Sequence, residues 1–172
     1  MCGRFGSAFS ASQLIDEFDL SNKPRLKKSY NTAPSQMILA VTKNSPNRGV
    51  MMKWQFVPEW QKPTEAKFKP INARDDKLDG GFYRQAFQCR RCLIPASFFY
   101  EWKRVVVDGK EEKQPYLIKI KNEDVFGMGG IYSIHKDADG TEHYFCAIVT
   151  TKPNDLMKPI HDRMPVIIHK DD

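Results

Sequence analysis

The sequence predicts an α+β fold with a largely antiparallel, curled or barrel-like sheet and a few short helices. Short segments rich in β-branched and aromatic residues recur along the chain, and turn residues join most of them in pairs, which is the order of hairpins. Only a few segments have the apolar spacing of a helix. We therefore expect about seven or eight strands and two or three short helices.

The first expected element is a helix over Ala11 to Asp19. Ser10 and Gln13 stand at the spacing of a capping box, and the apolar residues Leu14, Ile15 and Phe18 recur on one helical face. A basic connection, "NKPRLKKSYNTAPS", follows this helix. Beyond it, the segments "MILAVTK" and "GVMMKWQFVP" are typical of two strands joined by the turn "NSPNRG".

Two further hairpins are expected downstream. The stretch "RCLIPASFFYEWKRVVVDGKEEKQPYLIKIK" has the turn pair Asp108 and Gly109 near its middle, and "VFGMGGIYSI" is followed by "HYFCAIVTT" across "DADGTE". The segment "GGFYRQAFQC" is expected to form a short helix. So is "KPNDLMK", where Pro153 stands close to the start.

Length and composition indicate one globular domain over residues 1–172. No repeat, low-complexity tract or long linker divides the 172 residues, and 41% hydrophobic with 28% charged residues excludes disordered and fibrous classes. No apolar run approaches the roughly 20 residues that cross a bilayer, and the start does not resemble a secretory signal. We expect no membrane partner and a cytoplasmic location.

Net charge and cysteine content indicate which partners, redox state and metal sites to expect. A net charge of +6 permits an anionic partner such as nucleic acid without establishing one. The four cysteines, without an export signal, are expected to be reduced. The pair in "CRRC" lacks a second pair at zinc spacing, so we expect a strand entry with Cys92 buried and no metal.

The start "MCGRF" raises the possibility of chemistry at Cys2. Removal of Met1 would leave a free α-amine two carbons from a thiol. An α-amine has a pKa of about 7.7–8.0, so on the order of a tenth of it is neutral at pH 7. With an aldehyde, the amine forms an imine and the thiol closes a thiazolidine ring. The alternative is that Cys2 merely follows the start residue and packs as a small apolar side chain.

Three later stretches place polar residues inside apolar segments. These are Asn72 in "KPINARDD", Glu101 in "RCLIPASFFYEWK" and His161 in "IHDRMPVII". A carboxylate among aromatic residues is costly to bury in its ionised form, which suits a proton shuttle near neutrality, and histidine suits the same range. Taken singly, the residues could be a turn former, a residue on the outer face of a strand and a loop histidine.

Together with "MCGR", "YNTAP" and "WQFVPEW", these stretches closely resemble the SRAP family, the SOS response-associated peptidase domain. The motifs occur in the family's order from Cys2 to Pro165. The resemblance implies recognition of abasic sites in single-stranded DNA and a thiazolidine crosslink between the N-terminal cysteine and the ring-opened sugar. It also implies lyase-like chemistry through the imine and no cofactor. We expect a monomer that is associated with the nucleoid when it is engaged on DNA.

The resemblance assigns roles residue by residue. The resemblance makes Cys2 the nucleophile through its amine and thiol. Asn72 is expected to hold the opened sugar or its hydroxyls, and Glu101 to move protons. His161 is expected to assist opening of the sugar or to stabilise the resulting charge. Seven residues are expected to contact DNA, with arginines on phosphates, tryptophans stacked on bases and the remainder lining the path of the strand: Arg4, Arg74, Arg163, Trp60, Trp102, Asn31 and Pro34. Core packing remains the alternative for the tryptophans, and a structural ion pair for Arg74 and Arg163.

The chain departs from the family's pattern in three places. Gln55 replaces a usual glycine, and in "INARDD" the arginine is followed by an acid where a small or hydroxyl residue is more common. The chain stops at Asp172, so we expect the C-terminal part of the usual domain to be absent.

Two other functions stay open. Cys2 with Glu101 and His161 could cleave a peptide bond, including one in the chain's own N-terminal extension. A nucleic-acid binder without catalysis would rely on the basic surface alone, and its binding would survive Cys2→Ala.

Overall fold

The computed structural model describes residues 2–42 and 47–169 and has the α+β class that the sequence predicts. The described residues form two α-helices, α1 (Ala11–Phe18) and α2 (Arg84–Cys89), and one 3-10 helix, η1 (Asp75–Lys77). They also form the strands β1 (Arg4–Ser7), β2 (Ser29–Thr32), β3 (Met37–Thr42), β4 (Arg48–Trp54), β5 (Asn72–Arg74), β6 (Arg91–Ala96), β7 (Phe98–Val107), β8 (Lys110–Ile118), β9 (Phe126–Lys136), β10 (Glu142–Thr151), β11 (Met164–Pro165) and β12 (Ile167–Ile168).

Five strands close into a barrel in the order β10, β4, β3, β6, β9 and back to β10. Four of the five pairings are antiparallel, as the hairpin order predicts. The fifth, between β4 and β10, is parallel and aligns Phe145 with Lys53. The short strand β5 also pairs in parallel with β10, which brings Asn72 opposite Ile148.

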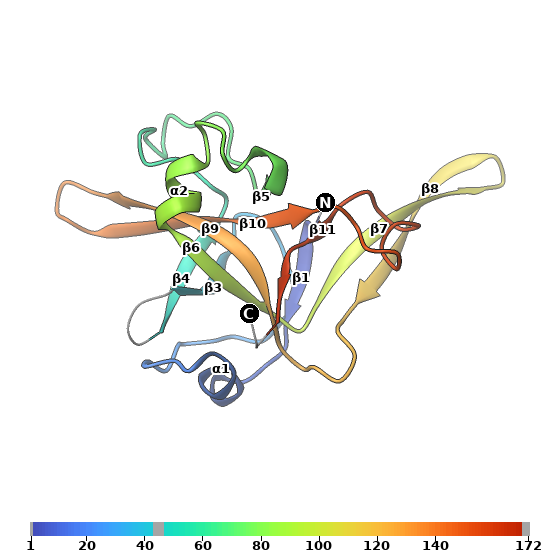
Figure 1. The fold of residues 1–172 in the computed structure, drawn as a ribbon, viewed down its shortest axis with the longest axis horizontal. Coiled ribbons are helices and arrows are strands. Elements are labelled where there is room, and N and C mark those ends of the chain that lie inside the picture. The colour runs from blue at the N-terminus through green and yellow to red at the C-terminus, as the bar shows by residue number, and fades with distance from the viewer. Residues whose placement is uncertain (1, 43–46, 170–172) are drawn as a thin grey trace.

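A second sheet has the strand order β2, β1, β7, β8. Its strands β7 and β8 extend away from the rest of the molecule as a long hairpin, the arm, while the β9–β10 hairpin extends in the opposite direction (Figure 1). The arm turns at Asp108 and Gly109, both at positive φ. Two consecutive residues at positive φ match the twist of a two-residue hairpin loop, so the predicted turn is confirmed.

The chain passes from the barrel to the second sheet at Ser97, between β6 and β7. The Ser97 backbone donates to the carbonyl of Gly6 at 2.8 Å, which fastens this crossing to β1. The stretch predicted as one strand of a hairpin is therefore two strands in two sheets. The crossing lets β7 carry Glu101 out of the barrel and alongside β1.

The first residues of the chain belong to the main core. Cys2 and Phe5 pack in one cluster with Trp54 and Phe99, and the rings of Phe5 and Trp54 meet edge to face at 5.2 Å. The Trp54 indole donates to the carbonyl of Ile71 at 2.9 Å, immediately before Asn72. The core thus fixes the N-terminal segment and the start of β5 together.

The helices differ in part from the expected ones. The predicted capping box of Ser10 and Gln13 is present, and α1 ends one residue before the predicted Asp19, which turns to positive φ as the C-cap. The helix in "GGFYRQAFQC" exists but is shorter, as α2. No helix of the described residues has the length and apolarity needed to span a membrane.

The predicted helix in "KPNDLMK" is wrong, because residues 155–160 form consecutive turns. Hydrogen bonds run from Lys158 to Asn154 and from His161 to Met157, but Pro159 has no amide hydrogen to continue the series. The strand number was also underestimated, since strands of two to four residues are too short to show an alternating pattern. The expected turn "NSPNRG" lies partly outside the described residues.

We predict that Gly130→Ala destabilises the barrel. An added Cβ would lie 2.9 Å from Cys92 Sγ and from Ile94 Cδ1, and 3.2 Å from the carbonyl of Ala147. Overpacking of this kind costs about 1–3 kcal/mol, which chemical denaturation can measure. Gly129→Ala is the matched control, because its Cβ would meet Val166 at an ordinary 3.4 Å. Equal losses of stability in both variants would contradict this packing.

Candidate active site

Four residues predicted for catalysis come together from four separate segments. Cys2 precedes β1, Asn72 begins β5, Glu101 lies in β7, and His161 lies in the turns after β10. The Asn72 side chain donates to the Cys2 carbonyl at 3.0 Å, and His161 Nε2 lies 3.9 Å from Glu101 Oε2. The negative charge of Glu101 also acts on the Cys2 thiol. The fold therefore assembles the whole predicted set at one place.

The Cys2 side chain is completely buried, with 0% of its surface exposed. Burial raises the pKa of its thiol well above the ordinary value of 9.0, and the neighbouring charge of Glu101 raises it further. Cys2 therefore carries its hydrogen at neutral pH. This environment is the opposite of the electropositive surroundings that produce a reactive thiolate.

Asn72 presents a buried acceptor beside Cys2. Because the Cys2 carbonyl needs a donor, the amide nitrogen of Asn72 faces it and Oδ1 points the other way. This oxygen is buried and accepts no hydrogen bond from any described residue. A buried acceptor of this kind can take a hydrogen bond from a hydroxyl group of a bound molecule.

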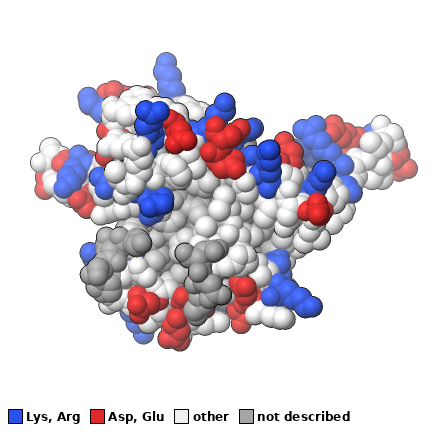
Figure 2. Space-filling model, in the orientation of Figure 1, with Lys and Arg blue, Asp and Glu red and all other residues white. Residues whose placement is uncertain are grey.

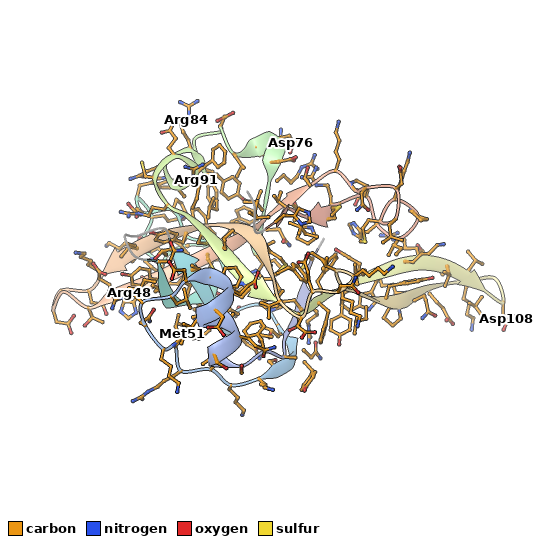
Figure 3. All side chains as sticks on the ribbon, turned by 60° about the horizontal axis from the view of Figure 1, so that its bottom comes forward. Arg48, Met51, Asp76, Arg84, Arg91 and Asp108 are labelled. Carbon is orange, nitrogen blue, oxygen red and sulfur yellow. The ribbon has the colours of Figure 1, made fainter. Side chains whose placement is uncertain are left out.

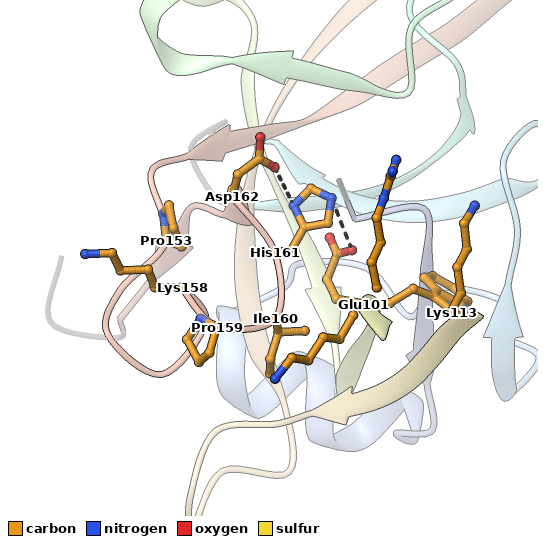
Figure 4. A pocket seen from close by; sticks show the side chains of 11 residues that line it. Glu101, Lys113, Pro153, Lys158, Pro159, Ile160, His161 and Asp162 are labelled. Atoms are coloured by element: carbon orange, nitrogen blue, oxygen red, sulfur yellow. Dashed lines mark ion pairs between the residues drawn. The ribbon is translucent and has the colours of Figure 1, made fainter. Parts of the chain in front are cut away.

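Glu101 is 1% exposed and projects from β7 toward His161 (Figure 4). The separation of 3.9 Å between Glu101 Oε2 and His161 Nε2 is longer than a hydrogen bond, but it is close enough for a strong charge interaction if the imidazole is protonated. Glu101 thus acts electrostatically on the Cys2 thiol and also approaches the imidazole. This is the position that a proton shuttle between them requires.

The contacts of His161 indicate where its imidazole carries a proton. The backbone N–H of Arg163 donates to Nδ1 at 3.0 Å, while the Asp162 carboxylate lies 2.8 Å from the same nitrogen. A neutral ring can accept from the backbone only if its proton is on Nε2. Asp162 pairs with Nδ1 when the ring is protonated at both nitrogens, and otherwise its largely exposed side chain can turn to water. In both states the Nε2 hydrogen faces Glu101.

An open cleft of about 980 Å³ has Glu101 and His161 in its wall (Figure 4). The arm contributes three cations to this cleft, Lys103, Arg104 and Lys113, and the turns after β10 contribute Lys158 from the other side. Asp162 and Glu101 are the two acidic residues that line it. The cleft therefore has an excess of positive charge around the catalytic candidates, which suits an anionic strand.

Trp102 also lines this cleft, whereas Trp60 lies elsewhere on the surface. Trp60 is 67% exposed, and its ring meets Phe82 edge to face at 6.2 Å. Core packing, the alternative considered for Trp60, therefore does not apply.

Arg4 and Asn31 lie side by side on β1 and β2, where Arg4 Nη1 donates to Asn31 Oδ1 at 2.9 Å. Pro34 is half-buried in the turn that follows β2. These three residues share the β1–β2 edge of the second sheet, and β1 directly follows Cys2. The edge can therefore border a strand bound at the site.

Arg74 and Arg163 are both found in ion pairs, but their exposure differs. Arg74 forms a two-pronged pair with Asp76, at 2.9 and 2.7 Å, and is half-exposed. Arg163 is only 6% exposed and pairs with Asp75 at 2.6 Å. Both line a second pocket of about 430 Å³. Arg74 can exchange its partner for a phosphate, whereas Arg163 is held inside the fold.

The model of the family described as "SOS response associated peptidase (SRAP)" matches residues 1–172. The chain belongs to the SRAP family. The abasic site processing protein YoaM of Bacillus subtilis is 42% identical over 99% of this chain and 76% of its own length. The abasic site processing protein HMCES of Xenopus tropicalis is 30% identical over 70% of this chain and 42% of its own length.

A solved structure shares this SRAP fold. The crystal structure of a protein from Bacteroides thetaiotaomicron superposes with a TM-score of 0.86 at 23% identity, and the match covers 99% of this chain and 78% of that one. A second, from Bordetella bronchiseptica, has a TM-score of 0.82 at 20% identity. At these identities the likeness concerns the fold alone.

Sequence reasoning missed several residues of this SRAP site. The cleft cations Lys103 and Arg104 directly follow "YEW", so their position on the same strand as Glu101 could have indicated them. Phe68 is another exposed aromatic residue, 63% exposed with its ring centroid 5.7 Å from that of Phe82, but it is not among the residues that line the cleft.

Net charge alone does not mark the binding face. On the face shown in Figure 2, Lys and Arg side chains alternate with Asp and Glu over the arm and the upper rim, and the white surface below the rim carries few charges. No group of three or more His, Cys, Asp or Glu side chains in residues 2–42 and 47–169 is arranged to hold a metal ion. The local excess of cations in the cleft indicates a surface for an anionic partner more specifically than the net charge does.

We predict that Cys2 resists alkylation in the folded protein at neutral pH. Iodoacetamide should modify the exposed Cys89 first, because burial shields the Cys2 thiol and raises its pKa. Peptide mapping by mass spectrometry measures both rates in one sample, and denatured protein is the control in which all four cysteines react. Labelling of Cys2 as fast as Cys89 in the folded protein would contradict the buried site.

Proposed function

We propose that this SRAP protein processes abasic sites in single-stranded DNA by forming a thiazolidine crosslink through Cys2. The observation that carries the proposal is the meeting of Cys2, Asn72, Glu101 and His161, of which Glu101 and His161 form part of the wall of a cleft rich in cations. Its relatives YoaM and HMCES are named abasic site processing proteins, which supports abasic sites as the target.

The reaction requires a free amine on Cys2. In the printed sequence this nitrogen is in a peptide bond with Met1, so hydrolysis of that bond has to come first. An aminopeptidase suffices, since cysteine is small. The family description also contains the word peptidase, which makes cleavage by the chain itself an outcome that the experiment has to distinguish.

Opening of the sugar is assigned to His161 and Asn72. In the closed sugar, C1′ carries a hydroxyl group and the ring oxygen. The Nε2–H of His161 donates a hydrogen bond to the ring oxygen, and the proton of the C1′ hydroxyl passes by way of Glu101 to that oxygen as its bond to C1′ breaks, which gives the aldehyde. The buried Oδ1 of Asn72 accepts a hydrogen bond from a hydroxyl of the opened sugar.

Formation of the crosslink begins with the amine, because the Cys2 thiol keeps its hydrogen. The nitrogen attacks C1′, and loss of one water gives the imine. The thiol sulfur then bonds to the same carbon while its hydrogen is transferred to the nitrogen, so that the ring closes with one water lost overall. Glu101 relays the protons, and the tethered thiol benefits from a high effective concentration.

The imine also accounts for lyase-like chemistry. An imine at C1′ acidifies the adjacent C–H group, so loss of that proton can expel the 3′ phosphate and cut the strand. Closure of the thiazolidine removes the imine before this happens. The balance between the two outcomes therefore depends on how quickly the buried thiol reaches C1′.

We predict a heat-stable adduct between Cys2 and a single strand that carries one abasic site. Protein lacking Met1 should form it, and mass spectrometry should map it to Cys2 with the loss of one water. Cys2→Ala keeps the amine but lacks the thiol, so it should give only an imine that borohydride traps. Glu101→Gln should slow the reaction by about 10²-fold, the lower range for loss of a positioned proton-transfer group.

Other outcomes of this experiment favour the other functions. Cleavage of a peptide substrate with no adduct on the DNA would support a peptidase. Reversible binding that is unchanged in Cys2→Ala would support a binding protein without catalysis. Wild-type rates in Glu101→Gln would exclude Glu101 as the proton relay.

We predict that Arg74→Ala reduces the salt dependence of DNA binding by about one unit of slope, since one phosphate contact is lost. Fluorescence anisotropy at several salt concentrations measures this slope. Arg48→Ala is the control, because Arg48 is an exposed arginine that lies well apart from Asp76, the partner of Arg74 (Figure 3). Equal slopes in the wild type and Arg74→Ala would remove Arg74 from the phosphate contacts.

A further inference from the structure

Asp75 forms a hydrogen-bonded junction outside the catalytic cleft. Its carboxylate accepts from the Thr151 hydroxyl at 2.6 Å, from Arg163 Nη2 at 2.6 Å and from the Asp76 backbone at 2.9 Å. The hydrogen bond from Thr151 lowers the pKa of Asp75 below its ordinary value of 3.8, and the bond from Arg163 lowers it further. Asp75 is therefore ionised at neutral pH.

Arg163 depends on this carboxylate. Its guanidinium is buried, and its Nη2 also bonds to the Thr150 carbonyl, while its Nε makes no hydrogen bond with any described residue. Asp75 is the acidic partner with which Arg163 forms a salt bridge in the described part of the chain. Loss of that partner would leave a buried charge uncompensated, which is strongly unfavourable, so the arginine would leave its site.

The backbone of Arg163 connects this junction to catalysis. Its N–H donates to His161 Nδ1 at 3.0 Å, which favours the proton of the neutral ring on Nε2, toward Glu101, in competition with the Asp162 carboxylate 2.8 Å from the same Nδ1. His161 and Arg163 are two residues apart in one loop, so a shift of the arginine moves the amide that favours the Nε2–H tautomer. Without this amide, Nδ1 can take the proton and donate it to Asp162, which leaves Nε2 without hydrogen.

We propose that Asp75 is a positioning residue that acts through Arg163 to hold the imidazole of His161 in the Nε2–H form. Asp75 directly follows Arg74 of β5, the strand that begins with Asn72, so one carboxylate connects the Asn72 strand to the His161 turn. The tautomer is a property of the protein alone. Only its consequence for catalysis rests on the proposed function.

The neighbouring ion pair of Arg74 and Asp76 can be compared with the pair of Arg163 and Asp75. Asp76 pairs with Arg74 as closely as Asp75 pairs with Arg163, but both members of that pair are half-exposed. Exposed pairs contribute little to structure, because water replaces the lost partner. Asp76→Ala is therefore a matched control that removes a carboxylate one residue away without disturbing the histidine.

The test is nitrogen NMR of the imidazole groups in protein without DNA, with His161 assigned by its loss in His161→Gln. The wild type and Asp76→Ala should show a hydrogen on Nε2 and a hydrogen-free Nδ1. Asp75→Ala should shift His161 toward the Nδ1–H form, and Asp75→Glu should restore at least part of the wild-type signal. An Nε2–H form that persists in Asp75→Ala would overturn the proposal.

Asp75→Asn keeps the size of the side chain and covers the case in which Asp75→Ala does not fold. The same shift is expected in Asp75→Asn, and its absence there would equally overturn the proposal. In the crosslinking assay, Asp75→Asn should react about tenfold or more slowly than Asp76→Ala at saturating DNA, since misplacement of a catalytic group lowers the rate steeply. If the wild type forms no crosslink, the proposed function fails, while the NMR result still decides the role of Asp75.

Discussion

The burial of Cys2 where the barrel meets the second sheet is the constraint on which the rest of the site depends. An N-terminal residue is usually mobile, yet here β1 pairs with β7 from Arg4 onward and Asn72 holds the carbonyl of Cys2. The same pairing aligns Arg4 with Tyr100, so Glu101 follows next to the start of β1. A reactive group fixed in this way has lost its conformational freedom before any DNA binds. The entropic cost of bringing it to the substrate is therefore lower.

This burial determines how Cys2 can react. A thiol without exposure and with a raised pKa is a poor nucleophile toward molecules in solution, and it is also protected from oxidation. An α-amine needs no such activation, because its ordinary pKa of about 7.7–8.0 already leaves part of it neutral. The site therefore suits a reaction in which nitrogen attacks first and sulfur follows inside the fold. The site is less suited to a reaction that begins with attack by an exposed thiolate.

Local signals predicted the parts of the fold that local interactions determine. The capping box of Ser10, the arm turn at Asp108 and the burial of Cys92 could all be identified from neighbouring residues. The parallel pairing of β4 with β10 could not, since nothing near Lys53 indicates a partner 92 positions later at Phe145. The four catalytic candidates were identified because each lies in a distinctive motif. The cleft cations were missed because lysines and arginines on an arm resemble any solvated strand.

The two arginine–aspartate pairs show why burial, which sequence does not reveal, decides what a charged residue does. Arg74 and Arg163 seemed equivalent as phosphate ligands, and each is now found beside one of two consecutive aspartates. The half-exposed pair can exchange a carboxylate for a phosphate at little cost, because water and salt already weaken it. Arg163 is buried while its partner Asp75 is 38% exposed, so loss of the carboxylate would leave the guanidinium charge uncompensated, and exchange is more costly there. The same two residue types therefore form one exposed pair, which we propose as the phosphate contact, and one pair whose arginine is buried beside the loop of His161.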